Sequence, residues 1–363
     1  MADTAGDKRI PVTVLTGYLG AGKTTLLNRI LGGAHGLRYA VIVNEFGEIG
    51  IDGDLIVHSD EELFEMNNGC ICCTVRGDLI RTLHGLLARP GRFDGVIVET
   101  TGLADPGPVA QTFFVDAKLR AQLRLDSITT LVDARHISGQ LADSREAVEQ
   151  VAFADQIVLN KTDLASEAEL QAVERQLRRL NPLAPIQRAL RSGVALDTVL
   201  GRGGFDLNRI VTLEPGFLQP DRPAHGQAGH VHDEHCGHDH DHDHDHDHDD
   251  GPADAPANHL HDSGIASVSL TSERPMDAAR VQAWLTQLVA AQGADILRAK
   301  GIIDVAGDER RLVFQAVHMI LEGDSPRPWR ADETRSSRLV FIGRHLDAAA
   351  LQAAFDACAA DLA

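Results

Sequence analysis

The sequence predicts two folded domains: an α/β domain with a mostly parallel sheet, then a small α+β domain with an antiparallel sheet. Within residues 8–205, short β-branched runs alternate with helical patterns, which is the order of βαβ units. Within residues 264–363, a strand, a helix, several strands and a final helix follow one another. In residues 206–263, Pro, Gly, His and Asp replace the periodic apolar positions, so we expect a disordered linker there.

The strands of the first domain are predicted where apolar, β-branched residues cluster, at residues 11–15, 40–43, 96–98, 128–132 and 157–159. One helix is clearly marked, because apolar residues recur at helical spacing from Val75 to Leu87 and Pro90 follows them.

The second domain is predicted from a strand at residues 265–270 and a helix with Val281, Trp284, Leu285 and Leu288 on one face. Strands at residues 302–305, 312–318 and 339–342 and a helix from about residue 347 complete it. We expect His318, at the end of one strand, to be a structural histidine rather than a ligand. We find no catalytic motif in this domain.

Composition places the chain among ordinary globular proteins. Its 363 residues are 43% hydrophobic and 24% charged, and no apolar run reaches the roughly 18 to 20 residues of a membrane helix. No secretory h-region precedes the first strand, so we expect a cytoplasmic protein without a membrane partner. In that reducing compartment the five cysteines are expected to be metal ligands or catalytic thiols rather than disulfides.

The formal net charge of −19 is unevenly distributed. Residues 225–262 contain eleven acidic residues, twelve of the 18 histidines and no Lys or Arg. The acidic balance argues against a nucleic-acid partner. We expect the alternating His-Asp run to bind divalent ions loosely as a reservoir, with a purely solubilising tract as the alternative. The candidate ligands in this run are His230, His232, His235, His238, His240, His242, His244, His246 and His248.

Residues 17–24 read GYLGAGKT and match G-x-x-x-x-G-K-[ST] between a predicted strand and a predicted helix, which is the context this motif needs. Backbone N–H groups of such a loop, at the positive end of a helix, bind phosphate groups. Lys23 is expected to reach the β- and γ-phosphate oxygens, and the Thr24 hydroxyl to ligate Mg²⁺. The alternative is a plain turn between strand and helix.

The nucleotide base is predicted from the sequence NKTD at residues 160–163, directly after an apolar strand. A carboxylate such as Asp163 accepts both hydrogens from the N1 and N2 edge of guanine, a pattern that adenine lacks. The stem of Lys161 can cover the plane of the base. The sequence therefore predicts GTP, although the tetrapeptide alone is also typical of a helix N-cap.

Residues 96–102 (VIVETTG) form an apolar strand that ends in an acid. We expect Glu99 to hold Mg²⁺ through its water shell, and the N–H of Gly102 to sense the γ-phosphate and to move after hydrolysis. The alternative is an N-cap acid before Thr100 and Thr101.

Three cysteines lie within four residues, after a turn that contains Gly69. The thiolates of Cys70, Cys72 and Cys73 can converge on one soft or borderline metal ion, with a fourth oxygen, nitrogen or water ligand. Inert buried cysteine is the alternative, and it fits the isolated Cys358.

Residues 44–52 (NEFGEIGID) follow the second predicted strand and fit a mobile switch loop. Glu45, Glu48 or Asp52 could orient the attacking water or complete the cysteine site, with a solvated loop as the alternative.

Together, GYLGAGKTT, VNEFGEIGID, NNGCICC, VETTGLADPGPV, NKTD, the His-rich linker and the later KGIIDV, RLVFQAVH and RLVFIG resemble the CobW family of metal-handling GTPases, most closely its YjiA-like branch. The resemblance covers nearly the whole chain except the His-rich tract. It implies a P-loop GTPase domain, a CobW C-terminal domain, and slow GTP hydrolysis coupled to binding of Zn²⁺ or a related divalent ion and its delivery to a client protein.

The resemblance also assigns site residues. The nucleotide loop falls on Gly17, Gly20, Ala21, Gly22, Lys23, Thr24 and Thr25, the base element on Asn160, Lys161 and Asp163, the Glu-x-x-Gly element on Glu99 and Gly102, and the metal motif on Cys70, Cys72 and Cys73, with Glu48 matching an acid near the metal. Val43 departs from the pattern, because the YjiA-like branch has an acid there, which puts any metal site that uses that carboxylate in question.

The predicted function is therefore a metallochaperone GTPase. The nearest alternative is a nickel- or cobalt-enzyme maturation GTPase, which the His-rich tract also fits. A P-loop kinase would need ATP, against which Asp163 argues, and a passive metal store would leave the nucleotide motifs without a role.

Overall fold

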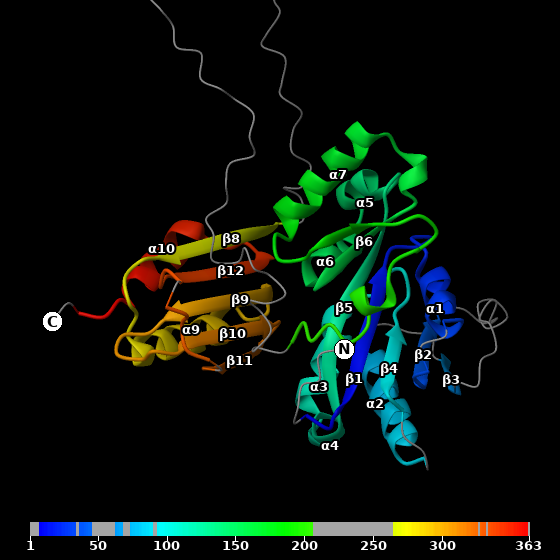
Figure 1. Ribbon diagram of the computed structural model, residues 1–363, viewed down its shortest axis with the longest axis horizontal. Coiled ribbons are helices and arrows are strands. Elements are labelled where there is room, and N and C mark those ends of the chain that lie inside the picture. The colour runs from blue at the N-terminus through cyan, green and yellow to red at the C-terminus, as the bar shows by residue number, and fades with distance from the viewer. Residues whose placement is uncertain are drawn as a thin grey trace, which may run out of the picture.

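The computed structural model describes residues 7–33, 36–45, 62–67, 73–89, 93–205, 264–325, 327–331 and 333–361. Two sheets organise these residues (Figure 1). The first domain, residues 7–205, carries a seven-stranded sheet, and the second domain, residues 264–361, carries a five-stranded sheet.

The seven strands of the first sheet lie in the order β3-β2-β4-β1-β5-β6-β7, and every pairing between them is parallel. This confirms the predicted α/β class. The strands are β1 (Ile10–Gly17), β2 (Tyr39–Glu45), β3 (Glu62–Asn67), β4 (Gly95–Glu99), β5 (Leu123–Asp133), β6 (Gln156–Asn160) and β7 (Ile186–Arg188). β3 and β7 were not predicted; both are edge strands, and neither has the continuous apolar run of a strand that is buried on both faces.

Helices cover both faces of this sheet. Along β4, Val96 and Val98 pack into the core on one face, whereas Ile97 packs against the opposite face, where α1 lies. The helices are α1 (Lys23–Leu31), α2 (Cys73–Leu87), α3 (Pro106–Val115), α4 (Ala117–Gln122), α5 (Ile137–Asp143), α6 (Arg145–Phe153) and α7 (Glu167–Leu180), with 3-10 turns η2 (Thr162–Leu164) and η3 (Leu196–Thr198). None of the helices within the described residues is long and apolar enough to cross a lipid bilayer.

The second sheet is antiparallel, in the order β11-β10-β9-β12-β8, as the predicted α+β class requires. Its elements are β8 (Ile265–Ser272), α9 (Ala278–Gln292), β9 (Ile296–Asp304), β10 (Arg311–Val317), β11 (Ile320–Asp324), β12 (Ser337–Arg344) and α10 (Ala348–Asp356). β9 begins six residues before the predicted strand. Arg298 and Lys300 interrupt its apolar pattern, yet both are buried, because they face Asp155 of the first domain.

The central strands of the second sheet, β10, β9 and β12, are buried on both faces. In β12, Leu339 and Phe341 pack with α9 and α10, whereas Val340 and Ile342 join the core of the first domain. One apolar cluster therefore crosses the boundary between the two domains and holds the two sheets in contact.

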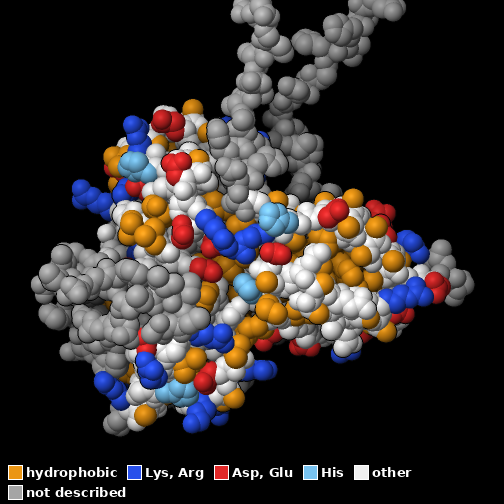
Figure 2. All heavy atoms as spheres, turned by 180° about the vertical axis from the view of Figure 1, so that it is seen from behind, with side chains coloured by type: hydrophobic (Ala, Val, Ile, Leu, Met, Phe, Trp, Pro, Cys, Tyr) orange, Lys and Arg blue, Asp and Glu red, His pale blue; other side chains and the backbone are white. Residues whose placement is uncertain are grey.

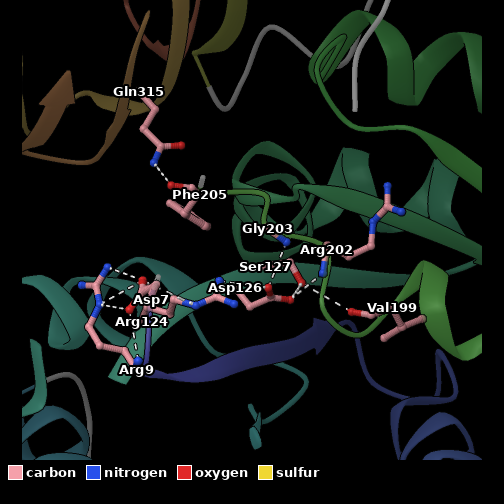
Figure 3. Close-up of polar contacts among 10 residues, drawn as sticks. All are labelled: Asp7, Arg9, Arg124, Asp126, Ser127, Val199, Arg202, Gly203, Phe205 and Gln315. Carbon is pink, nitrogen blue, oxygen red and sulfur yellow. Dashed lines mark hydrogen bonds and ion pairs between the residues drawn. The ribbon is translucent and has the colours of Figure 1, made fainter. Parts of the chain in front are cut away.

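The segment that leaves the first domain is fixed by a buried carboxylate (Figure 3). Asp126, on β5, is fully buried and accepts hydrogen bonds from the N–H groups of Arg202 and Gly203, both at 2.9 Å. Three residues beyond Arg202, the carbonyl of Phe205 accepts a 2.8 Å hydrogen bond from the side chain of Gln315 on β10. Asp126 thus helps to dock the end of the first domain on the second sheet.

We predict that Asp126→Asn destabilises the fold by about 2 to 3 kcal/mol, because an amide NH₂ would face one of two buried N–H donors. The midpoint of urea unfolding measures this effect. Asp308→Asn is the matched control: Asp308 also accepts a backbone hydrogen bond, from Arg310, but at the surface, so its midpoint should change much less. Equal shifts for the two variants would contradict the role of Asp126.

Candidate functional site

The glycine-rich loop connects the end of β1 to the start of α1, as predicted. Gly22 caps α1 with φ +107°, a conformation that favours glycine. Lys23 is buried, and its ammonium donates hydrogen bonds to the carbonyls of Gly17 at 2.7 Å and Tyr18 at 3.3 Å. The loop is thus folded around the ammonium of Lys23, a positive charge that attracts phosphate groups. Thr25 is exposed on the first turn of α1.

Two oxygen-bearing side chains lie together beside this loop. Thr24, on α1, donates a hydrogen bond of 3.3 Å from its hydroxyl to the Glu99 carboxylate at the end of β4. Glu99 is only 6% exposed. A hydroxyl and a carboxylate at one point are the hard oxygen donors that Mg²⁺ prefers, so these residues fit the ion.

The loop after β4 approaches the glycine-rich loop closely. A Cβ atom at Gly102 would lie 2.7 Å from the backbone nitrogen of Leu19, so only glycine fits there. Upstream, Thr100 donates hydrogen bonds of 2.9 Å from its N–H to the Leu15 carbonyl and from its hydroxyl to Thr16. The backbone of Gly102 is therefore held against the phosphate loop.

Asn160, the last residue of β6, joins the phosphate loop to the loops beside it. Its side-chain NH₂ donates to the Ala21 carbonyl at 2.9 Å and to the Ser192 hydroxyl at 3.1 Å, and its side-chain oxygen accepts from the N–H of Ser192 at 2.8 Å. The Ser192 hydroxyl in turn donates to the Gly22 carbonyl at 3.0 Å. Ser192 was not predicted from the sequence.

Lys161 follows in the left-handed region, with φ 59°. Its ammonium lies 2.7 Å from a carboxylate oxygen of Asp133, at the end of β5, and His136 contacts the same oxygen at 3.1 Å. Burial raises the pKa of the Asp133 carboxyl, but hydrogen bonds from Lys161, His136 and the N–H of Arg135 outweigh it, so the net pKa is lowered. Asp163, two residues after Lys161, is exposed.

Asp133 and Ser192 are thus residues that the sequence analysis missed. A signal for Asp133 was present, because it directly follows an apolar strand at the carboxyl edge of the sheet, where α/β proteins place their ligands. Ser192 had no comparable signal: it follows a strand of only three residues, and its φ of 53° is unusual for serine.

The predicted metal ligands cannot be placed in the same way. Cys73 begins α2, and the other predicted ligands, Cys70, Cys72, Glu48 and the histidines of residues 230–248, lie outside the described residues. Among the residues that are described, we find no group of three or more His, Cys, Asp or Glu side chains arranged to hold a metal ion.

Comparison with known proteins decides the family. Residues 11–188 match the model described as "CobW/HypB/UreG, nucleotide-binding domain", and residues 265–359 match the "Cobalamin synthesis protein cobW C-terminal domain". The "Zinc chaperone YjiA" of Escherichia coli (strain K12) is 35% identical over 351 residues, which cover 95% of this chain and 98% of that protein. The chain belongs to the CobW family.

Two further comparisons extend this similarity. The "Zinc-regulated GTPase metalloprotein activator 1" of Schizosaccharomyces pombe is 41% identical over 213 residues, 56% of this chain and 49% of that protein. The crystal structure of Zn(II)-bound YjiA GTPase from E. coli superposes with a TM-score of 0.70 at 29% identity, covering 98% of this chain and all of that one. Both domains of this CobW family member thus have the fold of a solved relative.

We predict that Gly22→Ala destabilises the nucleotide-free protein more than Gly20→Ala does. Both glycines have positive φ, which costs an alanine about 1 to 2 kcal/mol. A Cβ at Gly22 would also lie 2.5 Å from the Asn160 NH₂, whereas a Cβ at Gly20 meets nothing within 4 Å. Thermal unfolding without nucleotide measures the contact between Gly22 and Asn160 separately from ligand contacts. Identical melting temperatures for the two variants would contradict the close packing of Asn160 against the glycine-rich loop.

Proposed function

We propose that this protein is a GTPase that couples GTP binding and hydrolysis to the binding of Zn²⁺, or a related divalent ion, and to its delivery to a client protein. One observation carries the proposal: the predicted phosphate, Mg²⁺ and base residues lie at one edge of the first sheet, in a chain that aligns almost end to end with a zinc chaperone.

Phosphate binding is assigned to the loop of Gly17, Gly20, Ala21, Gly22, Lys23, Thr24 and Thr25. Lys23 exchanges its backbone carbonyl partners for β- and γ-phosphate oxygens, where its charge offsets that of the leaving group. Thr24 and Glu99 are the residues that would hold Mg²⁺, which neutralises charge on the transferred group. The N–H of Gly102 faces the γ-phosphate and loses this contact after hydrolysis.

Base recognition is assigned to Asn160, Lys161 and Asp163. The exposed Asp163 carboxylate accepts hydrogen bonds from the guanine N1 and N2 groups. Asp133 holds the ammonium of Lys161 at one edge of the base, so that the lysine stem lies across the plane of the base. Water then attacks the γ-phosphorus, the bond to the β–γ bridging oxygen breaks, and GDP and phosphate form.

Metal binding is assigned to Cys70, Cys72 and Cys73, with Glu48 as a further candidate ligand near the metal, and the His-rich run serves as a loose reservoir. GTP orders residues 44–52 and so shapes the cysteine site, and hydrolysis relaxes this loop and releases the ion to the client. The similarity to a zinc-regulated GTPase metalloprotein activator supports a client of the metalloprotein class.

We predict that Asp163→Asn exchanges guanine for xanthine specificity. An amide offers one donor and one acceptor, which match the N1–H and C2 carbonyl of xanthine but not the two donors of guanine. GDP affinity should fall about 100-fold and XDP affinity should rise, as measured by calorimetry. Asp143→Asn, at an exposed position on α5, controls for the loss of charge. An unchanged ratio of GDP to XDP affinity would remove Asp163 from the base site.

We also predict that Zn²⁺ binds more tightly with Mg²⁺ and a non-hydrolysable GTP analogue than with GDP or without nucleotide. Competition with a chelator of known affinity measures the three dissociation constants. Cys72→Ser should remove the nucleotide-dependent site and spare GDP binding, because the thiolate is a ligand and the serine hydroxyl stays protonated. Cys358→Ser substitutes a buried cysteine of the second domain. It should leave nucleotide-dependent Zn²⁺ binding and GDP binding unchanged.

Deletion of residues 225–262 should lower the total number of ions bound without altering the nucleotide-dependent site. Three equal dissociation constants in the intact protein would refute the coupling. Nucleotide-dependent binding that survives Cys72→Ser would place the site elsewhere.

A further inference from the structure

Helix α6 lies between the first sheet and the second domain (Figure 1). Every residue from Ala147 to Phe153 is buried. An ordinary surface helix buries one stripe, so a helix buried all round is packed by structure on every side. Here those sides are the first sheet, the neighbouring helices and β9 of the second domain.

On one side, α6 holds the loop that carries Gly102. The side-chain NH₂ of Gln150 donates two hydrogen bonds to this loop, to the carbonyl of Gly102 at 3.0 Å and to that of Ala104 at 3.1 Å. Gln150 is 1% exposed, so neither donor can turn to water instead. A rotation of the Gly102 backbone toward or away from a γ-phosphate must therefore break or remake these hydrogen bonds.

On the other side, α6 contacts the second domain through Glu149, the residue before Gln150. The Glu149 carboxylate, buried on α6, pairs with Arg344 at the end of β12 and accepts a hydrogen bond of 2.7 Å from Arg145. Two residues after the end of the helix, Asp155 pairs with the fully buried Arg298 of β9 and lies 3.9 Å from Lys300. The helix is thus anchored to the second sheet at two points.

Charges of both domains meet at this boundary. Figure 2 shows basic, acidic and histidine side chains gathered along it on the face seen from behind. Asp105, which ends the loop and caps α3, interacts electrostatically with Glu149 and also with Arg344 and His318 of the second domain. The loop after β4 is therefore connected to the second domain through α6, and the carboxylate of Asp105 lies within electrostatic range of that domain.

We propose that Gln150 is a positioning residue for the Gly102 loop, and that α6 transmits the position of this loop to the second domain through the Glu149–Arg344 pair. This coupling rests on the proposed function, because it requires Gly102 to respond to the γ-phosphate. It gives the second domain two arrangements, one with GTP and one with GDP, and so makes this domain the part that reports the nucleotide state to a client.

The sequence supplies the probe for this coupling. Its two tryptophans, Trp284 and Trp329, both lie in the second domain. Trp284 packs against Phe341 and Phe355, and Trp329 packs against the core that the two domains share. Tryptophan emission therefore changes with nucleotide only if the change at the phosphate site reaches the second domain.

The experiment compares tryptophan emission of the full chain with saturating Mg²⁺–GDP and with a Mg²⁺–GTP analogue that is not hydrolysed, with binding of both measured by calorimetry. The wild type should give different spectra in the two states. Gln150→Leu should abolish this difference and lower kcat more than it raises KM, because the loop is no longer held for the transition state. Arg344→Gln should abolish the difference and leave kcat unchanged. Arg280→Gln removes an exposed ion pair with Asp361 in the same domain. This variant should keep both the difference in emission and the wild-type kcat.

Identical spectra in a wild type that binds both nucleotides would overturn the coupling while leaving the proposed GTPase function intact. A full difference in Arg344→Gln would also overturn it. If the wild type bound neither nucleotide, the coupling and the proposed function would both fail.

Discussion

The side-chain amide of Asn160 is the interaction on which the arrangement of the nucleotide site depends. Its side-chain oxygen accepts a hydrogen bond from the N–H of Ser192, and its side-chain nitrogen donates one to the Ala21 carbonyl of the phosphate loop. Its backbone carbonyl accepts a 2.9 Å hydrogen bond from the N–H of Ala134, which follows β5. Three connections that are distant in sequence thus meet at this one buried residue, two through its side chain and one through its backbone. A phosphate loop alone binds many nucleotides. In the proposed site, Asn160 ties this loop to residues 160–163 and so sets the distance between the phosphates and the base.

A second constraint fixes the two domains relative to each other. The second sheet buries apolar side chains on both faces, one against α9 and α10 and the other against the first domain. Interfaces between domains of one chain are usually more polar than obligate interfaces, and relative motion is the default expectation unless the interface is large and apolar. Here a shared apolar core and the ion pairs of Glu149 and Asp155 favour a small number of defined arrangements over free motion.

The sequence predicted the parts of the fold whose physical signals are local. The motif of the phosphate loop, the apolar strands β1, β2, β4 and β6, and the helix from Val75 to Leu87 all depend on residues close in sequence. The start of β9 was missed, because Arg298 and Lys300 are polar in sequence and are buried only when Asp155 of the other domain pairs with them. Asp133 and Ser192 act through contacts with Lys161 and Asn160 that exist only after the sheet has formed.

Nucleotide and metal binding are linked in the proposed mechanism, and linkage is reciprocal: if GTP tightens Zn²⁺ binding, Zn²⁺ must tighten GTP binding by the same factor. The most direct test is therefore the dissociation constant of a Mg²⁺-bound, non-hydrolysable GTP analogue, measured once with saturating Zn²⁺ and once with a zinc chelator. Coupling of ordinary strength predicts affinity that is about 5- to 150-fold higher with Zn²⁺. The same dissociation constant in both conditions would contradict a GTPase that uses nucleotide to control its metal.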